Sequence, residues 1–280
     1  GAATAAIMSA GVALITVFFQ GEKQLKMIAL QGMSMELGGV IFLSISGMLA
    51  GFSWRYPFFI YALGFVAFFM LLLFVPKCGK AEEEVQDTQD SFQQQGVPVW
   101  LVLLIAFFGM LMFFTAMVSL PIYLQNDLGY SPSFTGYYLA VLDLVAVLAA
   151  GVMPKIVAKI HEKNCLVIAF FCYGAAFLIY FLSGHIAALG AAVLLAGAGF
   201  GLSTPLFNSL VVRKSTPKNK GTNISLCTMA MFLGQFLSAL LVSGFSGKKM
   251  FLAAVVISWI AGMSILPVTK MYERKDSQSR

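Results

Sequence analysis

Two carboxylates lie inside long apolar stretches of this sequence, and they are the residues best placed for proton chemistry. Asp143 stands in Val-Leu-Asp-Leu-Val, ten residues into a stretch that begins near Phe134. At 1.5 Å per residue of helix, its carboxyl lies roughly 15 Å along that stretch, close to the middle of a membrane span. No Lys or Arg stands in any apolar core to pair with it. Such a carboxyl favours its neutral form and can act as a reversible proton carrier.

Each acid also has a structural interpretation. Asp143 could be held protonated by a backbone carbonyl or a serine of a neighbouring helix, without any part in transport. Glu36 stands about a turn and a half from the basic end of its stretch. It could form a gate contact, or its flexible side chain could reach water or Lys26. We therefore predict proton coupling at Asp143 and Glu36, and the structural interpretation of each stays open.

A second group of residues could bind a solute. Asn208 follows a glycine run and a proline, where a helix could bend and expose backbone carbonyls to a cavity. Polar and aromatic side chains in apolar stretches give a candidate substrate cavity of Asn208, Thr115, Phe113, Tyr137, Tyr138 and Thr204. Small residues and a proline give candidates for helix packing or gating: Gly38, Gly39, Gly47, Gly197, Gly199, Gly201 and Pro205. It is equally open that the amides only join helices and the aromatics only pack or face lipid.

The sequence lacks the residues that a metal site, a nucleotide site or a hydrolytic active site would need. His161 and His185 lie in connectors at opposite faces of the membrane, and the four cysteines show no metal-ligand spacing. The sequence has no phosphate-binding loop and no Ser, His and Asp series. We therefore expect no metal, no cofactor, no catalytic residue and no enzyme activity.

The elements that must position these residues are membrane-spanning helices. Apolar residues make up 59% of the chain and charged residues only 11%, and period-2 alternation is absent, so helices are the spanning form that satisfies the backbone. We predict an all-α polytopic membrane protein with nine transmembrane helices, over residues 1–19, 29–51, 57–75, 98–122, 134–153, 165–183, 187–211, 223–245 and 250–268.

The basic residues predict the orientation. Alternate connectors and the C-terminal tail hold 15 of the 18 Lys and Arg residues, and cytoplasmic loops collect these residue types. The opposite side has only Arg55, Lys248 and Lys249. The C-terminus is therefore expected in the cytoplasm, and the net charge of +6 needs no nucleic-acid partner.

A polar, acidic linker over 77–97 divides the chain. We expect 1–76 to be the second part of an N-terminal helical half, 98–268 a complete six-helix C-terminal half, and 269–280 a cytoplasmic tail. An internal repeat supports this division, because residues 28–38 and 224–234 share six identities at a constant offset. On that basis three more helices are expected before Gly1.

Three stretches resemble the major facilitator superfamily. The segment Gly47 to Phe58 is similar to the family's outer turn between its fifth and sixth helices, and Leu120 to Gly136 is similar to the turn between its seventh and eighth. The basic segment Gly151 to Lys163 lies where the family repeats its cytoplasmic Gly-rich motif. The resemblance implies a partial fold containing the fourth to twelfth helices. It also implies a central cavity exposed alternately to the two sides and driven by a proton or solute gradient.

These observations together predict a secondary transporter. Aromatic richness and the lack of intramembrane Lys or Arg favour proton-coupled export of small amphipathic compounds, by antiport in a cell (inner or plasma) membrane. Residues 39–47 lack the proline of the family's export motif, which favours uptake of a small metabolite instead. The sequence leaves two further classes open: a truncated, non-transporting remnant or scaffold, and a membrane enzyme. The expected partners are protons, the solute and the lipid bilayer, and the chain is expected to be a monomer.

Overall fold

The computed structural model describes residues 7, 10, 11, 14, 15, 18, 19, 21–74, 98–216, 219–245 and 247–278. Within these residues the fold is all-helical, as predicted. The predicted linker over 77–97 lies outside the described residues, as does most of the predicted helix over 1–19. The elements in chain order are α2 (Gly21–Phe52), η1 (Tyr56–Ala62), α3 (Leu63–Phe74), α4 (Val99–Ile122), η2 (Tyr123–Asp127), α5 (Pro132–Leu182), α6 (Ile186–Lys214), α7 (Lys220–Gly244) and α8 (Lys249–Gln278).

The predicted count of nine transmembrane helices is not supported, because the described residues form six helices long and apolar enough to cross a membrane. The segment predicted over 57–75 consists of a short 3-10 helix followed by a 12-residue α-helix. The helix predicted over 134–153 and all but the last residue of the helix predicted over 165–183 lie within the 51 residues of α5. A span needs only roughly 20 residues, so α5 is long enough for two.

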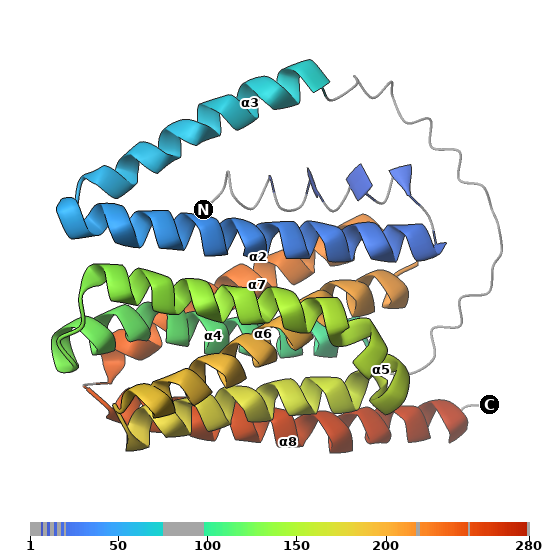
Figure 1. Ribbon diagram of the computed structural model, residues 1–280. Coiled ribbons are helices and arrows are strands. Elements are labelled where there is room, and N and C mark those ends of the chain that lie inside the picture. Colours follow the sequence, from blue (N-terminus) through green and yellow to red (C-terminus); the bar gives the residue numbers. More distant parts are fainter. Residues whose placement is uncertain are drawn as a thin grey trace.

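Helix α5 is two arms joined at a sharp break. His161 has φ 66° and ψ 156°, which is not a helical conformation. Ser131 precedes the first arm (132–160), and its side chain caps the helix by accepting a hydrogen bond from the Phe134 N–H. Tyr138 in this arm approaches Tyr180 in the second arm (162–182), with 3.0 Å between their hydroxyl oxygens. The chain therefore turns back on itself at His161, and the arms lie antiparallel (Figure 1).

Glycines let α6 pack closely against both arms of α5. A methyl group at Gly197 or Gly201 would overlap the backbone of the first arm, at Leu142 and Ala146 respectively. A methyl group at Gly199 would come within 2.9 Å of the Ala169 carbonyl oxygen in the second arm. Small residues permit such close approach between membrane helices. Helix α6 thus lies in the groove between the two arms.

The core of the described residues lies among α4, α5, α6, α7 and α8. Phe207 of α6 is fully buried and fills the notch left by Gly109 of α4. Gly234 of α7 packs on the backbone of α4 in a similar way. Buried aromatic rings of η2, α5 and α8 meet at one end of this bundle, where Tyr123, Tyr180 and Phe251 are in ring contact.

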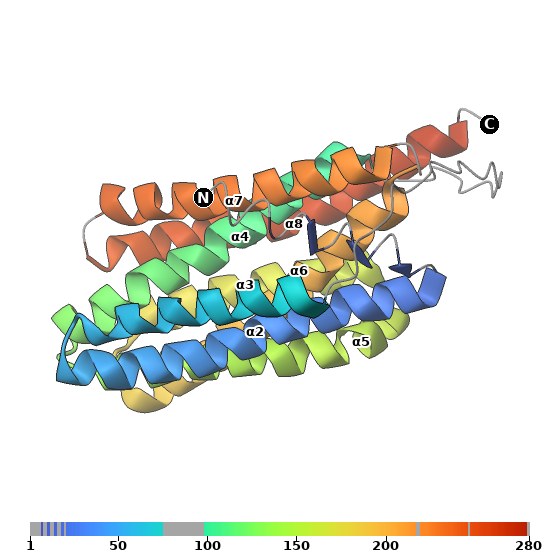
Figure 2. The ribbon, with the colours of Figure 1, turned by 90° about the horizontal axis from the view of Figure 1, so that it is seen from above.

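Helix α2 joins this bundle along one side only. It packs mainly on α5 and touches α6, and Figure 2 shows it beside α5 and apart from α7. Helix α3 contacts η1 but none of the other described helices, and it diverges from α2 in Figure 1. Most of the large apolar side chains of η1 and α3 are therefore exposed.

Candidate functional site

Asp143 lies at the interface between α2 and the first arm of α5. Only 4% of the residue is exposed. Its carboxyl group lies against Gly39 of α2, where even a methyl group would overlap the carboxylate. One carboxylate oxygen, Oδ1, has no hydrogen-bond partner among the described residues. Burial without a partner disfavours the charged form, so this carboxyl is suited to hold a proton.

A seam of small residues holds α2 against α5 on one side of Asp143. Gly47 and Gly136 are in backbone contact, since a methyl group at Gly47 would come within 2.8 Å of the Gly136 Cα atom. The Ser133 hydroxyl donates a hydrogen bond of 3.2 Å to the Gly47 carbonyl oxygen. The described seam therefore depends on close backbone approach, and Asp143 is an ionisable group within it.

A small hollow of about 30 Å³ lies farther along the same seam. Gly32 of α2 and Ala150 of α5 line it, together with Phe200, Gly201, Thr204, Pro205 and Asn208 of α6. Gly32 precedes Gly39 by seven residues and Ala150 follows Asp143 by seven, so the hollow lies roughly 10 Å from the carboxyl. Helix α2 therefore covers both the acid and the hollow.

Residues of α6 bring groups that can form hydrogen bonds to the wall of the hollow. The Thr204 hydroxyl oxygen is buried and has no hydrogen-bond partner among the described residues. Pro205 has no N–H, so the Gly201 carbonyl lacks its usual helical donor four residues on. Asn208 lies one turn beyond Thr204 and adds an amide, which both donates and accepts. These groups could bind water or the polar part of a solute.

The structure separates the six residues predicted for the substrate cavity. Thr204 and Asn208 meet in the hollow. Phe113 is buried behind it and stacks on Phe200, with 3.4 Å between ring centroids. Thr115 is fully buried in α4 and donates to the Leu111 carbonyl of its own helix.

The two predicted tyrosines also lie away from the hollow. The Tyr138 hydroxyl bonds to Tyr180 and donates a 2.7 Å hydrogen bond to the Leu189 carbonyl oxygen. It thereby ties α6 to both arms of α5. Its neighbour Tyr137 is 45% exposed on the outside of the bundle.

The predicted packing residues on α2 differ from one another. Gly39 and Gly47 both meet α5, but among the described residues a methyl group at Gly38 would touch only Phe42 of its own helix. Gly234, the counterpart of Gly38 in the internal repeat, packs on α4. The side chain of Glu36 lies outside the described residues, so its predicted role stays a prediction.

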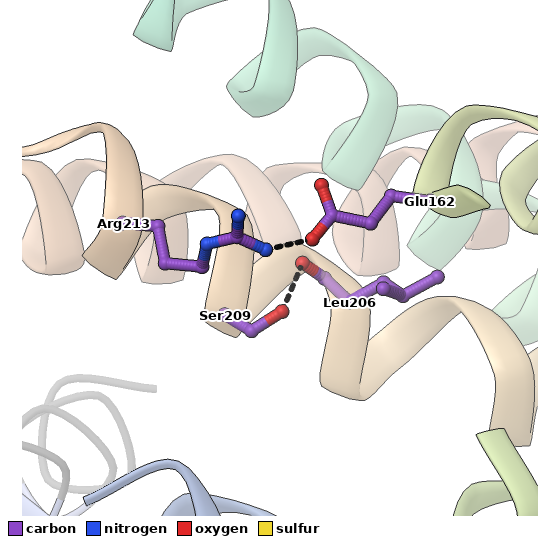
Figure 3. Close-up of polar contacts among 4 residues, drawn as sticks. All are labelled: Glu162, Leu206, Ser209 and Arg213. Atoms are coloured by element: carbon purple, nitrogen blue, oxygen red, sulfur yellow. Dashed lines mark hydrogen bonds and ion pairs between the residues drawn. The ribbon is translucent and has the colours of Figure 1, made fainter. Parts of the chain in front are cut away.

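Two features were missed by reasoning from the sequence. Gly32, Ala150 and Phe200 line the hollow, and only the seven-residue spacing of Gly32 from Gly39 could have pointed to it. The second is an ion pair between Glu162, just after the break in α5, and Arg213 in the last turn of α6. Figure 3 shows this pair beside the hydrogen bond from Ser209 to the Leu206 carbonyl. Both features depend on how α2, α5 and α6 are placed in space.

The fold and site define a polytopic helical membrane protein with a buried acid and a polar hollow under one shared helix. A sequence profile described as Major Facilitator Superfamily matches residues 1–239. The chain therefore belongs to the Major Facilitator Superfamily, and the resemblance inferred from its sequence is confirmed.

Solved structures show the same fold. The chain is similar to a crystal structure of a mutant of the peptide transporter POT in complex with sulfate, with a TM-score of 0.54 and 18% identity over 62% of this chain. A second crystal structure of the POT mutant matches 97% of this chain with a TM-score of 0.52 and 14% identity. The matches cover 38% and 53% of the two POT chains. No curated protein sequence matches the chain.

Proposed function

We propose that this protein is a proton-coupled secondary transporter that exports small amphipathic compounds and that Asp143 carries the proton. The observation that carries the proposal is the position of the carboxyl, buried in the α2–α5 seam with one oxygen unpartnered among the described residues. Membership of the Major Facilitator Superfamily and the fold shared with the peptide transporter POT support transport as the activity.

The seam supplies a physical link between proton and solute. With Asp143 neutral, Gly39 can rest against the carboxyl group and α2 stays close to α5. With Asp143 charged, the carboxylate requires water or a cation, and its most direct route to either is separation of α2. The same separation would uncover the hollow, because Gly32 of α2 lies on its wall. Protonation and access to the solute site are thus coupled through one helix.

The Asp143→Asn variant tests the proton carrier. We expect it to fold normally and to lose proton movement, because the amide mimics the protonated acid but cannot release a proton. The purified chain would be reconstituted in vesicles loaded with a pH-sensitive dye, and a panel of small amphipathic compounds added to each sample. Asp127→Asn is the matched control, because Asp127 is exposed at the end of η2.

The outcome separates coupling from structure. If Asp143→Asn vesicles still show compound-driven proton movement with a normal pH dependence, Asp143 is not the carrier. An imposed pH gradient distinguishes the two directions of transport: export by antiport moves compound against the proton flow, and uptake by symport moves it with the flow.

A further inference from the structure

We propose that the hollow binds the uncharged, hydrogen-bonding head group of the solute, so that the transported compounds are neutral amphipathic molecules such as aromatic amides and alcohols. This inference rests on the proposed transport function and names the class of its substrate.

The walls of the hollow select against charge. None of the described residues that line it is ionisable, and its walls are mainly glycine, alanine, proline and aromatic surface. A charged head group would lose its hydration there without meeting an opposite charge, which is strongly unfavourable. Asp143 does not line the hollow, because it lies two helical turns away and its carboxyl is directed at Gly39.

The polar groups of the hollow match a neutral head. The Thr204 hydroxyl oxygen is buried in the wall of the hollow and has no partner among the described residues, so it gains a hydrogen bond if the movement of α2 that admits the ligand also uncovers this oxygen. The Gly201 carbonyl can only accept, whereas Thr204 and Asn208 can both donate and accept. A primary amide has the complementary set of two N–H donors and a carbonyl acceptor. A hydroxyl group, with one O–H donor and an acceptor oxygen, can form part of the same pattern.

The size of the hollow and the shape of its wall indicate what the rest of the solute looks like. The hollow of about 30 Å³ is small and not fully enclosed, so a head group can enter it while the rest of the solute stays outside. Phe200 gives it a flat apolar wall, and the stacked ring of Phe113, inclined by only 9° to Phe200, holds that wall in place. An aromatic body can pack on this surface once α2 moves aside.

Three compounds that each carry one phenyl group but differ in charge test the head group: 2-phenylacetamide, 2-phenylethylammonium and phenylacetate. The purified full chain would be titrated with each compound, and apparent affinity read from the shift in thermal unfolding. We expect the neutral amide to bind at least about tenfold more tightly than either ion. Equal or tighter binding of an ion, or no shift with the amide, would overturn the proposal.

Substitutions then locate the binding. Thr204→Val keeps the shape of the side chain and removes the hydroxyl, so amide affinity should fall about threefold to tenfold. Thr228→Val is the matched control, because Thr228 lies on α7 and bonds to the Ile224 carbonyl of its own helix. If both variants bind the amide as the unaltered chain does, the site lies elsewhere and the proposal fails.

A variant that gains affinity for a new compound must still be folded, so it tests the site without the risk that loss of binding reflects misfolding. Asn208→Asp places a carboxylate in the hollow, so the preference should change from the amide to 2-phenylethylammonium by about tenfold. An unchanged preference contradicts the assignment of the hollow. Failure of the transport function would be seen separately, because the vesicle assay of proton movement uses a broad panel and the Asp143→Asn variant.

Discussion

Helices α4 to α8 supply the buried apolar core of the described residues, whereas α2, η1 and α3 turn most of their large apolar side chains outward. In α4, 61% of the most apolar window is buried, but in α2 only 6% of the corresponding window is buried. Both helices have the length and composition of membrane spans. Apolar composition therefore identifies a span but does not show which of its faces meets protein.

Small residues distinguish the two regions better than apolar ones do. Gly109, Gly197 and Gly201 each receive a side chain or a backbone segment from a neighbouring helix. Gly64 in α3 has nothing near its open side among the described residues. The α2–α5 seam lies between these extremes, because Gly39 and Gly47 pack closely while Gly32 borders a hollow. The candidate site is located where dense packing gives way to open packing.

The largest expected difference in stability is between two variants that each lose an aromatic ring, one in the buried core and one in α3. Phe207→Ala should destabilise the protein by about 3–5 kcal/mol, because it leaves a cavity beside Gly109 in a fully packed site. Phe68→Ala in α3 removes a ring that is 55% exposed and should change stability by less than about 0.5 kcal/mol. Unfolding in mixed detergent micelles, followed by tryptophan fluorescence, measures both. Similar losses in the two variants would mean that α3 is packed after all.

Adding a methyl group tests the same contrast from the opposite direction. Gly201→Ala should cost about 1–3 kcal/mol, since the new Cβ overlaps the Ala146 carbonyl and forces α5 and α6 apart. Gly32→Ala should be neutral or stabilising by up to about 1 kcal/mol, because its Cβ meets nothing within 4 Å among the described residues and alanine favours the helix. The unfolding assay above reports both values. A tolerated methyl group at Gly201 would contradict the close packing of α6.

The smallest expected effect comes from adjacent tyrosines at the border of the two environments. Tyr138→Phe should cost about 1–2 kcal/mol, because the Leu189 carbonyl and the Tyr180 hydroxyl lose their shared partner inside the bundle. Tyr137→Phe should have no measurable effect on unfolding, because that side chain is on the exposed face. If the order is reversed, the assignment of inner and outer faces in the first arm of α5 is wrong.

The sequence by itself determined the class of fold and pointed to the region of the candidate site. Long apolar stretches can satisfy their backbone in a membrane only as helices, and the described residues are all-helical. Asp143 could be singled out because no basic residue stands in an apolar core to pair with it. The glycine run before Pro205 marked α6 as a helix of close contacts, and its three glycines do meet both arms of α5.

Only the tertiary structure decided which side chains meet. Successive residues of a helix point about 100° apart, so Tyr137 is exposed while Tyr138 is buried. Reasoning from the sequence had placed both tyrosines in the substrate cavity. The contact of Asp143 with Gly39 and the alignment of Gly32 with the hollow depend on how far α2 slides along α5. The count of nine helices was not supported for other reasons: most of residues 1–19 lie outside the described residues, residues 57–74 form two short helices, and the two arms of α5 belong to one element that breaks at His161. Local periodicity determines each helix, but the register between helices is set by contacts between residues distant in the chain.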